Sequence, residues 1–222
     1  MKLTAAVFDF NGTLFFDTPL HLQVWDSIAM EVRGRGVTPK TIATRYSGMN
    51  NVQILQDLAP GRSPEWYQEM SEEKERRYRA AASAMPGGPQ MTPGAAEVMD
   101  WLQDHQIPMA LATASIAANV QFYVSTFHLD RWLSPDRIIY DDGRWPDKIA
   151  MYNEAVRRLN AGTSVLIFED SLTGIRCGAS LPGACLFVID SPALRPYYPD
   201  YPQIIRAVPD FRGLIPSLEK LF

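Results

Sequence analysis

The sequence contains only two cysteines, Cys177 and Cys185, among its 222 residues. This number is too small for a disulfide framework, and no histidines stand near them at the spacing of a zinc site. Long apolar stretches are missing as well, because none approaches the roughly 20 residues that a membrane-spanning helix requires. The segment before Asp9 is also too short for the apolar region of a signal peptide. We therefore expect a cytoplasmic protein with reduced cysteines and no membrane partner.

Charge of one sign is not concentrated in any part of the chain. The formal net charge is -4, and runs of like charges are short. This pattern argues against a nucleic-acid partner and against a polybasic membrane patch. The Gly-x-Ser-x-Gly elbow of serine hydrolases and the Walker loop are also absent. Binding of a phosphorylated molecule would therefore depend on a local site.

Apolar and amphipathic segments alternate along most of the chain. Apolar runs predict strands at residues 5–10, 108–112, 137–139, 164–168, 184–189 and 203–208, with helices between most of the later ones. Strands that alternate with helices form a parallel, doubly wound α/β sheet with right-handed crossovers. The segment 191–202 has four prolines and three tyrosines, and we expect it to be an extended loop.

Residues 18–85 show several helix signals and no convincing strand. Helices are predicted at residues 20–32, 39–46, 50–58 and 64–84, with Asp17 as a cap of the first rather than as a catalytic carboxylate. The last helix carries glutamates followed by arginines at spacings that allow ion pairs. We predict an all-helical cap domain at 18–85, inserted into an α/β core domain formed by 1–17 and 86–222.

Three predicted strands end in polar residues that can carry chemistry. Asp9 follows the first strand, Thr113 the second, and Glu169 with Asp170 a later one. The carboxyl ends of parallel strands lie at one edge of the sheet, where open α/β sheets bind ligands. The small residues 11–13 would let backbone amides approach an anion. Taken alone, this stretch favours a hairpin turn with Asp9 as an ordinary turn carboxylate, but the other strand ends favour a site.

The motifs Asp-x-x-Gly-Thr at residues 9–13 and Glu-Asp-Ser-x-x-Gly at residues 169–174 resemble those of a known family. The chain is similar to the haloacid-dehalogenase-type hydrolase superfamily, in the subgroup with a helical cap that includes β-phosphoglucomutase-like phosphatases. The resemblance covers essentially the whole chain. It implies a Rossmann-like core with a helical cap, a small phosphorylated substrate, Mg²⁺ as cofactor, and Asp9 as the nucleophile that accepts the phosphoryl group. We further expect a monomer or a weak homodimer.

The resemblance also implies roles for the other motif residues. The Mg²⁺ ligands would be Asp9, the backbone carbonyl of Asn11, Glu169 and Asp170, and the phosphoryl oxygens would be bound by Gly12, Thr13, Thr113 and Ser115. This set is chemically consistent, because Mg²⁺ prefers hard oxygen ligands and phosphoryl transfer requires a cation, a lysine and short donors. A carboxylate nucleophile divides hydrolysis into an aspartyl-phosphate step and a water step.

The expected lysine is less clearly marked in this sequence. Relatives usually present it in a Lys-Pro-x-Pro-Asp context, which this chain lacks. Residues 142–148 resemble the upstream half of that motif, so Lys148 is the candidate and Arg144 the alternative. Without such a role, both would be solvated loop charges.

Position 11 departs from the family pattern. Phosphatases and mutases of the family normally have an aspartate there, which serves as general acid and base. Asn11 can donate a hydrogen bond but cannot transfer a proton, and a general acid contributes about 10² to 10⁴ in rate. The substitution disfavours a mutase, which must activate a sugar hydroxyl in each cycle.

Several interpretations follow from Asn11. A phosphatase could use a substrate with a good leaving group, such as an acyl phosphate or phenolic ester, or take a proton from another residue. His21 is the candidate for that residue, although we favour its interpretation as a surface histidine on the first helix of the cap. The chain could also be a catalytically weak phosphate-binding or interaction protein. A dehalogenase ranks third, because the Glu169-Asp170 pair indicates a metal that dehalogenases lack. No arginine follows Gly48, so we expect a monophosphate.

Overall fold

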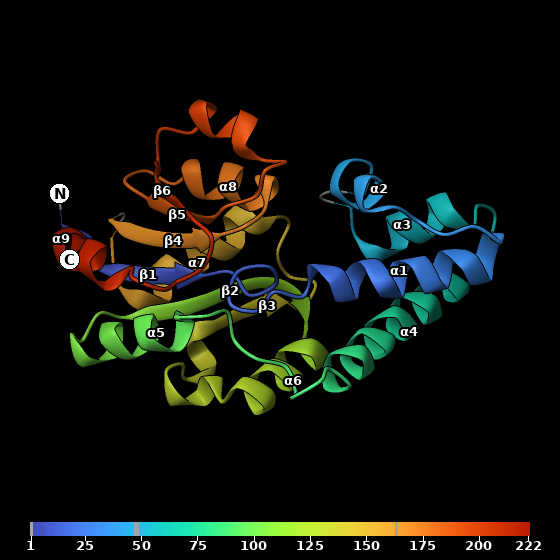
Figure 1. Cartoon of the computed structure of the whole chain (residues 1–222), viewed down its shortest axis with the longest axis horizontal. Coiled ribbons are helices and arrows are strands. Elements are labelled where there is room, and N and C mark those ends of the chain that lie inside the picture. Colours follow the sequence, from blue (N-terminus) through green and yellow to red (C-terminus); the bar gives the residue numbers. More distant parts are fainter. Residues whose placement is uncertain (1, 47–48, 163) are drawn as a thin grey trace. The chain divides into compact units, whose positions relative to one another are not determined.

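The computed structural model describes residues 2–46, 49–162 and 164–222, and Gly48 lies outside them. The chain forms two compact units, which we call the α/β unit and the helical unit (Figure 1). The α/β unit comprises Met1–Phe16 and Gln90–Phe222, and the helical unit comprises Asp17–Pro89. Every strand of the described residues belongs to the α/β unit.

The α/β unit is built on a six-stranded parallel sheet with the order β3-β2-β1-β4-β5-β6. The strands are β1 (Ala5–Phe8), β2 (Met109–Ile116), β3 (Ile138–Asp141), β4 (Val165–Glu169), β5 (Cys185–Ile189) and β6 (Ile204–Val208). The strand order reverses at β1, which pairs with both β2 and β4. The predicted doubly wound parallel sheet is confirmed, and its switch point is the place where such sheets bind ligands.

Helices cover both faces of this sheet. They are α5 (Ala95–Asp104), α6 (Ala117–Phe127), α7 (Lys148–Leu159), α8 (Leu172–Ala179) and α9 (Ile215–Leu221). Helices α7 and α8 pack against each other and against the sheet, while α5 and α6 cover the opposite face (Figure 1). The sequence did not indicate α9.

The proline-rich segment differs from its prediction. Arg195–Asp200 form the 3₁₀ helix η3 rather than an extended loop. Proline fixes φ near the value that a 3₁₀ turn requires, so prolines at the start of such a turn favour it. The prediction of an extended loop is therefore wrong for these six residues.

Alternate side chains of β1 enter two different apolar layers. Ala5 and Val7 join a buried cluster with residues of α7 and α8. Phe8 points to the other face and stacks on Phe168, with ring centroids 4.6 Å apart. A strand that is buried on both faces has a continuous run of apolar residues, and β1 has such a run. Asp9 continues the alternation of Ala5 and Val7, and this directs it toward the α7 side.

The helical unit contains α1 (Thr18–Arg33), α2 (Pro39–Thr44), α3 (Asn51–Leu58) and α4 (Pro64–Ser83). Helices α1, α3 and α4 pack together and bury apolar side chains such as Ile28, Leu55 and Tyr78. Polar caps set where α2, α3 and α4 begin, because the side chains of Thr38, Asn50 and Ser63 each accept a hydrogen bond from a first-turn amide.

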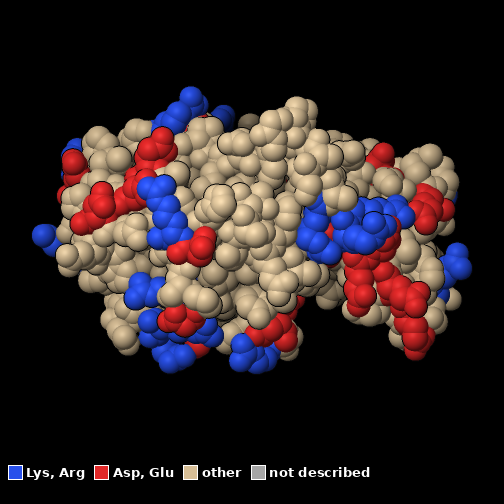
Figure 2. Space-filling view, turned by 90° about the horizontal axis from the view of Figure 1, so that it is seen from below, with Lys and Arg blue, Asp and Glu red and all other residues tan. Residues whose placement is uncertain are grey.

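Charged side chains on α4 form local pairs. Glu73 bonds to both Arg76 and Arg77 at 2.7 Å. On the molecular face shown in Figure 2, basic and acidic side chains likewise lie next to each other. In the part of the chain that the structure describes, no helix has the length and apolarity needed to cross a bilayer.

Candidate active site

The switch point of the sheet brings the predicted strand-end residues together. Asp9 follows β1, Thr113 lies in β2 and Glu169 ends β4, and β1 lies between the other two strands. All three side chains are buried, with exposures of 5%, 0% and 0%. Buried polar and charged groups are costly unless they are paired, so the partners of these three residues define the site.

Lys148 supplies positive charge to the strand ends. It is the first residue of α7, and its Nζ lies 2.5 Å from Asp9 Oδ1 and 2.5 Å from Glu169 Oε1. Arg144 instead pairs with a neighbouring aspartate and is largely exposed. The structure therefore places Lys148, and not Arg144, at the strand-end carboxylates.

Glu169 accepts hydrogen bonds at both carboxylate oxygens. Its Oε1 accepts from Lys148 Nζ and from Tyr152 Oη at 2.7 Å. Its Oε2 accepts from the backbone amides of Asp170 (2.8 Å) and Ser171 (2.9 Å) and from Ser171 Oγ (3.1 Å). Burial raises the pKa of Glu169, but the charge of Lys148 and these hydrogen bonds lower it below its ordinary value. Glu169 is thus a carboxylate in a fixed orientation.

The pKa of Asp9 moves in the opposite direction. Burial raises the pKa of Asp9 to about 7, while the ammonium of Lys148 lowers it and the carboxylate of Glu169 raises it. Burial lowers the pKa of Lys148, but the two carboxylates raise it above its ordinary value, so this lysine stays charged. One lysine thus serves two carboxylates, and a further cation beside Asp9 would favour its ionised form.

Three carboxylates are placed to hold such a cation. Asp9, Glu169 and Asp170 each offer an oxygen, and these atoms lie within 4.8 Å of one another. Opposite ligands of an octahedral Mg²⁺ ion are about 4.2 Å apart, twice a bond length of about 2.1 Å. The upper limit on the oxygen separations is therefore close to the span of one such ion, and the three carboxylates form a candidate cation site. The role of the Asn11 backbone carbonyl as a further ligand stays a prediction.

Two motif glycines let the acidic residues come close to the backbone. Gly12 has a φ of +77°, and a Cβ there would lie 2.0 Å from Asp170 Oδ2. A Cβ on Gly174 would lie 1.7 Å from Glu169 Oε1. Either contact would displace a carboxylate, which explains why both motifs contain glycine. Thr13 also contacts this cluster, with Oγ1 3.4 Å from Asp170 Oδ1.

Asn11 is held by hydroxyl groups from β2 and α6. Its Nδ2 donates to Tyr123 Oη at 2.9 Å, and its Oδ1 accepts from Ser115 Oγ at 2.7 Å. Thr113 Oγ1 lies 3.5 Å from the same Oδ1. Tyr123 is fully buried and stacks on Phe10, with ring centroids 3.9 Å apart. The predicted phosphate-binding residues Thr113 and Ser115 thus lie beside position 11.

Comparison with known families agrees with this geometry. A family model described as haloacid dehalogenase-like hydrolase matches residues 3–181. The chain belongs to this family. The matched range includes Asp9, Lys148 and the Glu169-Asp170 pair, so this haloacid dehalogenase-like hydrolase has its strand-end cluster within the family's own span.

Solved structures of similar fold include one that is described as a hydrolase of this family. A family IA, variant 3 hydrolase from Entamoeba histolytica is 29% identical, with a TM-score of 0.85 over 100% of this chain and 99% of that one. A mutant of CbbY from Rhodobacter sphaeroides, in complex with xylulose-(1,5)bisphosphate, is 19% identical, with a TM-score of 0.79 over 96% of both chains. A β-phosphoglucomutase from Clostridium difficile is 18% identical, with a TM-score of 0.74 over 98% and 96%. At such identities the last two similarities concern the fold.

His21 of this hydrolase belongs to a polar network inside the helical unit. Its Nε2 lies 3.3 Å from Asp17 Oδ2, its Nδ1 lies 3.1 Å from Lys74 Nζ, and its ring stacks on Tyr78. It is therefore a half-buried, bonded histidine rather than a surface one. Asp17 stands at the N-cap position of α1, but its carboxylate accepts a hydrogen bond from Tyr78 instead of capping the helix.

Two tyrosines of the site were not identified from the sequence. Tyr152 follows Lys148 by four residues, so both lie on one face of α7, and this spacing was a usable signal. Tyr123 reaches Asn11 across 112 positions in the chain, and its sequence context contains no motif. Only the packing of α6 on the sheet shows this contact.

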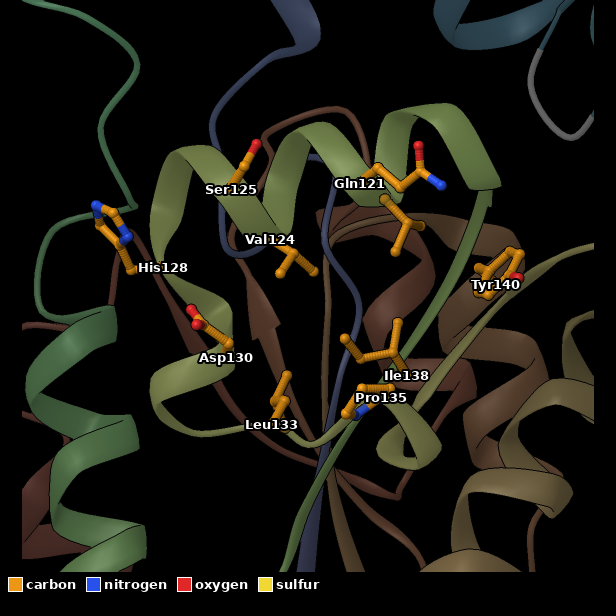
Figure 3. A pocket seen from close by; sticks show the side chains of 10 residues that line it. Gln121, Val124, Ser125, His128, Asp130, Leu133, Pro135, Ile138 and Tyr140 are labelled. Carbon is orange, nitrogen blue, oxygen red and sulfur yellow. The ribbon is translucent and has the colours of Figure 1, made fainter.

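An apolar hollow of about 380 Å³ lies elsewhere on the α/β unit. Figure 3 shows Val124 and Ser125 of α6 on one side of it and Leu133, Pro135 and Ile138 on another. None of the strand-end carboxylates lines it. We therefore assign no part of the phosphate chemistry to this hollow.

Proposed function

We propose that this haloacid dehalogenase-like hydrolase is a Mg²⁺-dependent phosphatase that acts on a small phosphorylated metabolite. The observation that carries the proposal is the placement of Asp9. Its carboxylate stands at the sheet's switch point, 2.5 Å from Lys148 Nζ and beside two further carboxylates. A nucleophile next to a lysine and an acidic cation site suits phosphoryl transfer, which depends on positioning and charge neutralisation.

In this proposal Asp9 attacks phosphorus and forms an aspartyl-phosphate, which water then hydrolyses. Lys148 neutralises negative charge on the nucleophile and on the transferred group. Bound Mg²⁺, held by Asp9, Glu169, Asp170 and the backbone carbonyl of Asn11, would supply further positive charge to the phosphoryl oxygens. Tyr152 and Ser171 keep Glu169 oriented through their hydrogen bonds.

Short donors near Asp9 would bind the phosphoryl oxygens. Thr113 and Ser115 carry hydroxyl groups near the end of β2. Gly12 and Thr13 lie in the turn that follows Asp9, and Gly12 has no Cβ that would keep an anion away from the backbone amides. Hydroxyl and amide donors aimed at the equatorial oxygens stabilise the charge that develops there. These four residues complete the proposed phosphate site.

The helical unit would serve as the cap that gives the enzyme its specificity. We propose functional domains at 1–17 with 86–222 for the core and 18–85 for the cap. A cap of this kind excludes water while the phosphoryl group is transferred, and its side chains would select the substrate.

A second function is favoured by Asn11. The amide stands at the family's acid and base position and is engaged by Ser115 and Tyr123. A protein that binds phosphate but turns it over weakly would tolerate this arrangement. The two functions differ in the rate of Asp9-dependent turnover, which is substantial for a phosphatase and weak or absent for a phosphate-binding protein.

The test is hydrolysis of acetyl phosphate and 4-nitrophenyl phosphate by wild type, Asp9→Ala and Asn11→Asp, with Mg²⁺ and with a chelator. We expect turnover by wild type with Mg²⁺, and a loss of at least about 10³-fold in Asp9→Ala and after chelation. Peptide mapping of position 11 is the control, because Asn-Gly deamidates readily and would generate aspartate. Turnover that persists in Asp9→Ala contradicts the proposal, and an inert wild type beside an active Asn11→Asp supports the phosphate-binding function.

A further inference from the structure

We propose that the substrate is an activated phosphate, whose leaving group departs as a stable anion without receiving a proton. The class comprises acyl phosphates and the phosphate esters of acidic phenols or enols. This inference rests on the proposed function and narrows its substrate class. It follows from the hydrogen bonds around Asn11 and from the positions of the groups that could supply a proton.

The hydrogen bonds at position 11 have a defined direction. Asn11 Nδ2 donates to Tyr123 Oη, and Ser115 Oγ donates to Asn11 Oδ1. Ser115 Oγ and Tyr123 Oη are 3.1 Å apart. A serine hydroxyl has a single proton, which here goes to Asn11, so Tyr123 is the donor in this third bond. The three bonds close a ring in which both hydroxyl protons are used.

This ring contains no acid of suitable strength. An amide cannot give up a proton under these conditions, and the protons of both hydroxyl groups already take part in hydrogen bonds of the ring. General acids work best when their pKa lies near the working pH. A sugar alkoxide or another poor leaving group would therefore find no adequate donor in the ring.

Each carboxylate of the cluster already has a role other than that of a general acid. Asp9 is the proposed nucleophile. Glu169 accepts bonds from Lys148, Tyr152 and the 170–171 backbone, and Asp170 accepts from Thr13. Glu169 and Asp170 are also the expected cation ligands. The nearest acidic groups thus have other tasks in the proposed reaction.

The two histidines of the α/β unit lie at the wrong edge of the sheet. His105 follows α5 and precedes β2, and His128 follows α6 and precedes β3. Both therefore stand near the amino ends of strands, whereas Asp9 follows the carboxyl end of β1. His105 is also bonded to the Trp101 carbonyl at 2.8 Å. Neither histidine is placed to protonate a leaving group at Asp9.

The proposed reaction balances without a general acid. Asp9 forms a bond to phosphorus while the bond from phosphorus to the leaving oxygen breaks, and the electron pair stays on that oxygen as a carboxylate, phenolate or enolate. Water then attacks the aspartyl-phosphate, the bond from Asp9 to phosphorus breaks, and both protons of the water leave with the phosphate product as H₂PO₄⁻. The net reaction is ROPO₃²⁻ + H₂O → RO⁻ + H₂PO₄⁻.

The experiment compares kcat/KM of the wild-type enzyme with Mg²⁺ on four probes of rising leaving-group pKa: acetyl phosphate, 4-nitrophenyl phosphate, phenyl phosphate and glycerol 3-phosphate. We expect a fall of about 10²-fold or more from the first two probes to the last, because a missing general acid costs about 10² to 10⁴. The first two probes also distinguish an acyl phosphate from a phenolic ester. Asn11→Asp should gain at least about 10-fold on glycerol 3-phosphate and far less on acetyl phosphate.

Two further variants distinguish this proposal from the alternative in which Tyr123 acts as a general acid. If Tyr123 protonates the leaving group through Ser115, Tyr123→Phe will lose activity selectively on the poor leaving groups, and this result overturns the proposal. Tyr67→Phe is the matched control, since it also removes a buried, hydrogen-bonded phenol hydroxyl. Equal wild-type rates on all four probes overturn the proposal too. Absence of Asp9-dependent turnover on every probe overturns the proposed function itself, and the substrate class with it.

Discussion

Gly174 shows how a single side chain governs the acidic cluster. Its Cα packs against the Glu169 carboxylate so closely that a methyl group would lie 1.7 Å from Oε1. In the interior of an ordinary helix, replacing glycine by alanine stabilises by about 1 kcal/mol. Here the same change must move a carboxylate that binds Lys148 and Tyr152.

We predict that Gly174→Ala weakens Mg²⁺ binding by about 10-fold to 100-fold, the usual cost of disturbing the groups that orient a metal ligand. Calorimetric titration with Mg²⁺ measures this directly. Gly178→Ala is the matched control on the same helix, since the atoms nearest to its Cβ would be methyl groups of Ile167 and Leu186, at 3.2 Å and beyond, and not a carboxylate. Equal Mg²⁺ affinity in both variants would show that the contact with Glu169 does not matter.

For single residues, much of the candidate site could be predicted from the sequence. Asp9, Thr113 and Glu169 were predictable, because each ends an apolar run in a chain whose strands had to be parallel. The Asn11 ring was not, because Tyr123 and Ser115 reach that amide only after α6 has packed on the sheet. Contacts between distant positions that carry no motif depend on exact packing, which periodicity does not specify.

At the element scale, alternation and capping predicted most helices and strands. The two elements that the sequence did not indicate, α9 and η3, have only seven and six residues. A periodic pattern of apolar residues cannot be recognised over so few positions. Helix α4 is the opposite case. Its 20 residues carry a strong pattern of charge pairs, and Arg77 also bonds to Glu31 of α1 at 2.8 Å.

These pairs predict a pH dependence for the helical unit. Hydrogen bonds from Arg76 and Arg77 lower the pKa of Glu73 to about 2. A lowered carboxyl pKa stabilises the folded state above the unfolded pKa of about 4.5, and this stabilisation is lost as pH falls toward 2. We expect Glu73→Gln to reduce stability by less than about 1 kcal/mol at pH 7, because the pair is partly exposed, and by less at pH 3. Urea unfolding at both pH values tests this, and a larger deficit at pH 3 would contradict it.

At the scale of the whole molecule, the chain joins a parallel sheet with a helical unit, and the sequence indicated both kinds of structure. The sheet's switch point gathers three carboxylates and one lysine from the residue after β1, the end of β4, the turn after β4 and the start of α7. Such a cluster would bind a cation only when the sheet is folded, so cation binding would report on the folding of the α/β unit.

We therefore predict that Mg²⁺ raises the melting temperature of the wild-type protein. A ligand that binds only the folded state stabilises it by about 2.7 kcal/mol at 100 times its Kd. Asp170→Asn removes one carboxylate of the cluster and should abolish most of the shift. Differential scanning calorimetry over a Mg²⁺ series measures both proteins. Equal shifts in the two would show that Mg²⁺ binds elsewhere.

The proposed mechanism depends most directly on the phosphorylation of Asp9 during turnover. The direct measurement is an acid quench of the enzyme with acetyl phosphate and Mg²⁺, followed by borohydride reduction, which converts an aspartyl-phosphate to homoserine, and by peptide mass mapping. Because the reaction lacks a general base at position 11, hydrolysis of the intermediate should be slow enough for it to accumulate. We predict homoserine at position 9 in the wild type and none in a mock reaction without acetyl phosphate. Homoserine at another aspartate, or turnover with unmodified Asp9 throughout, would contradict the account.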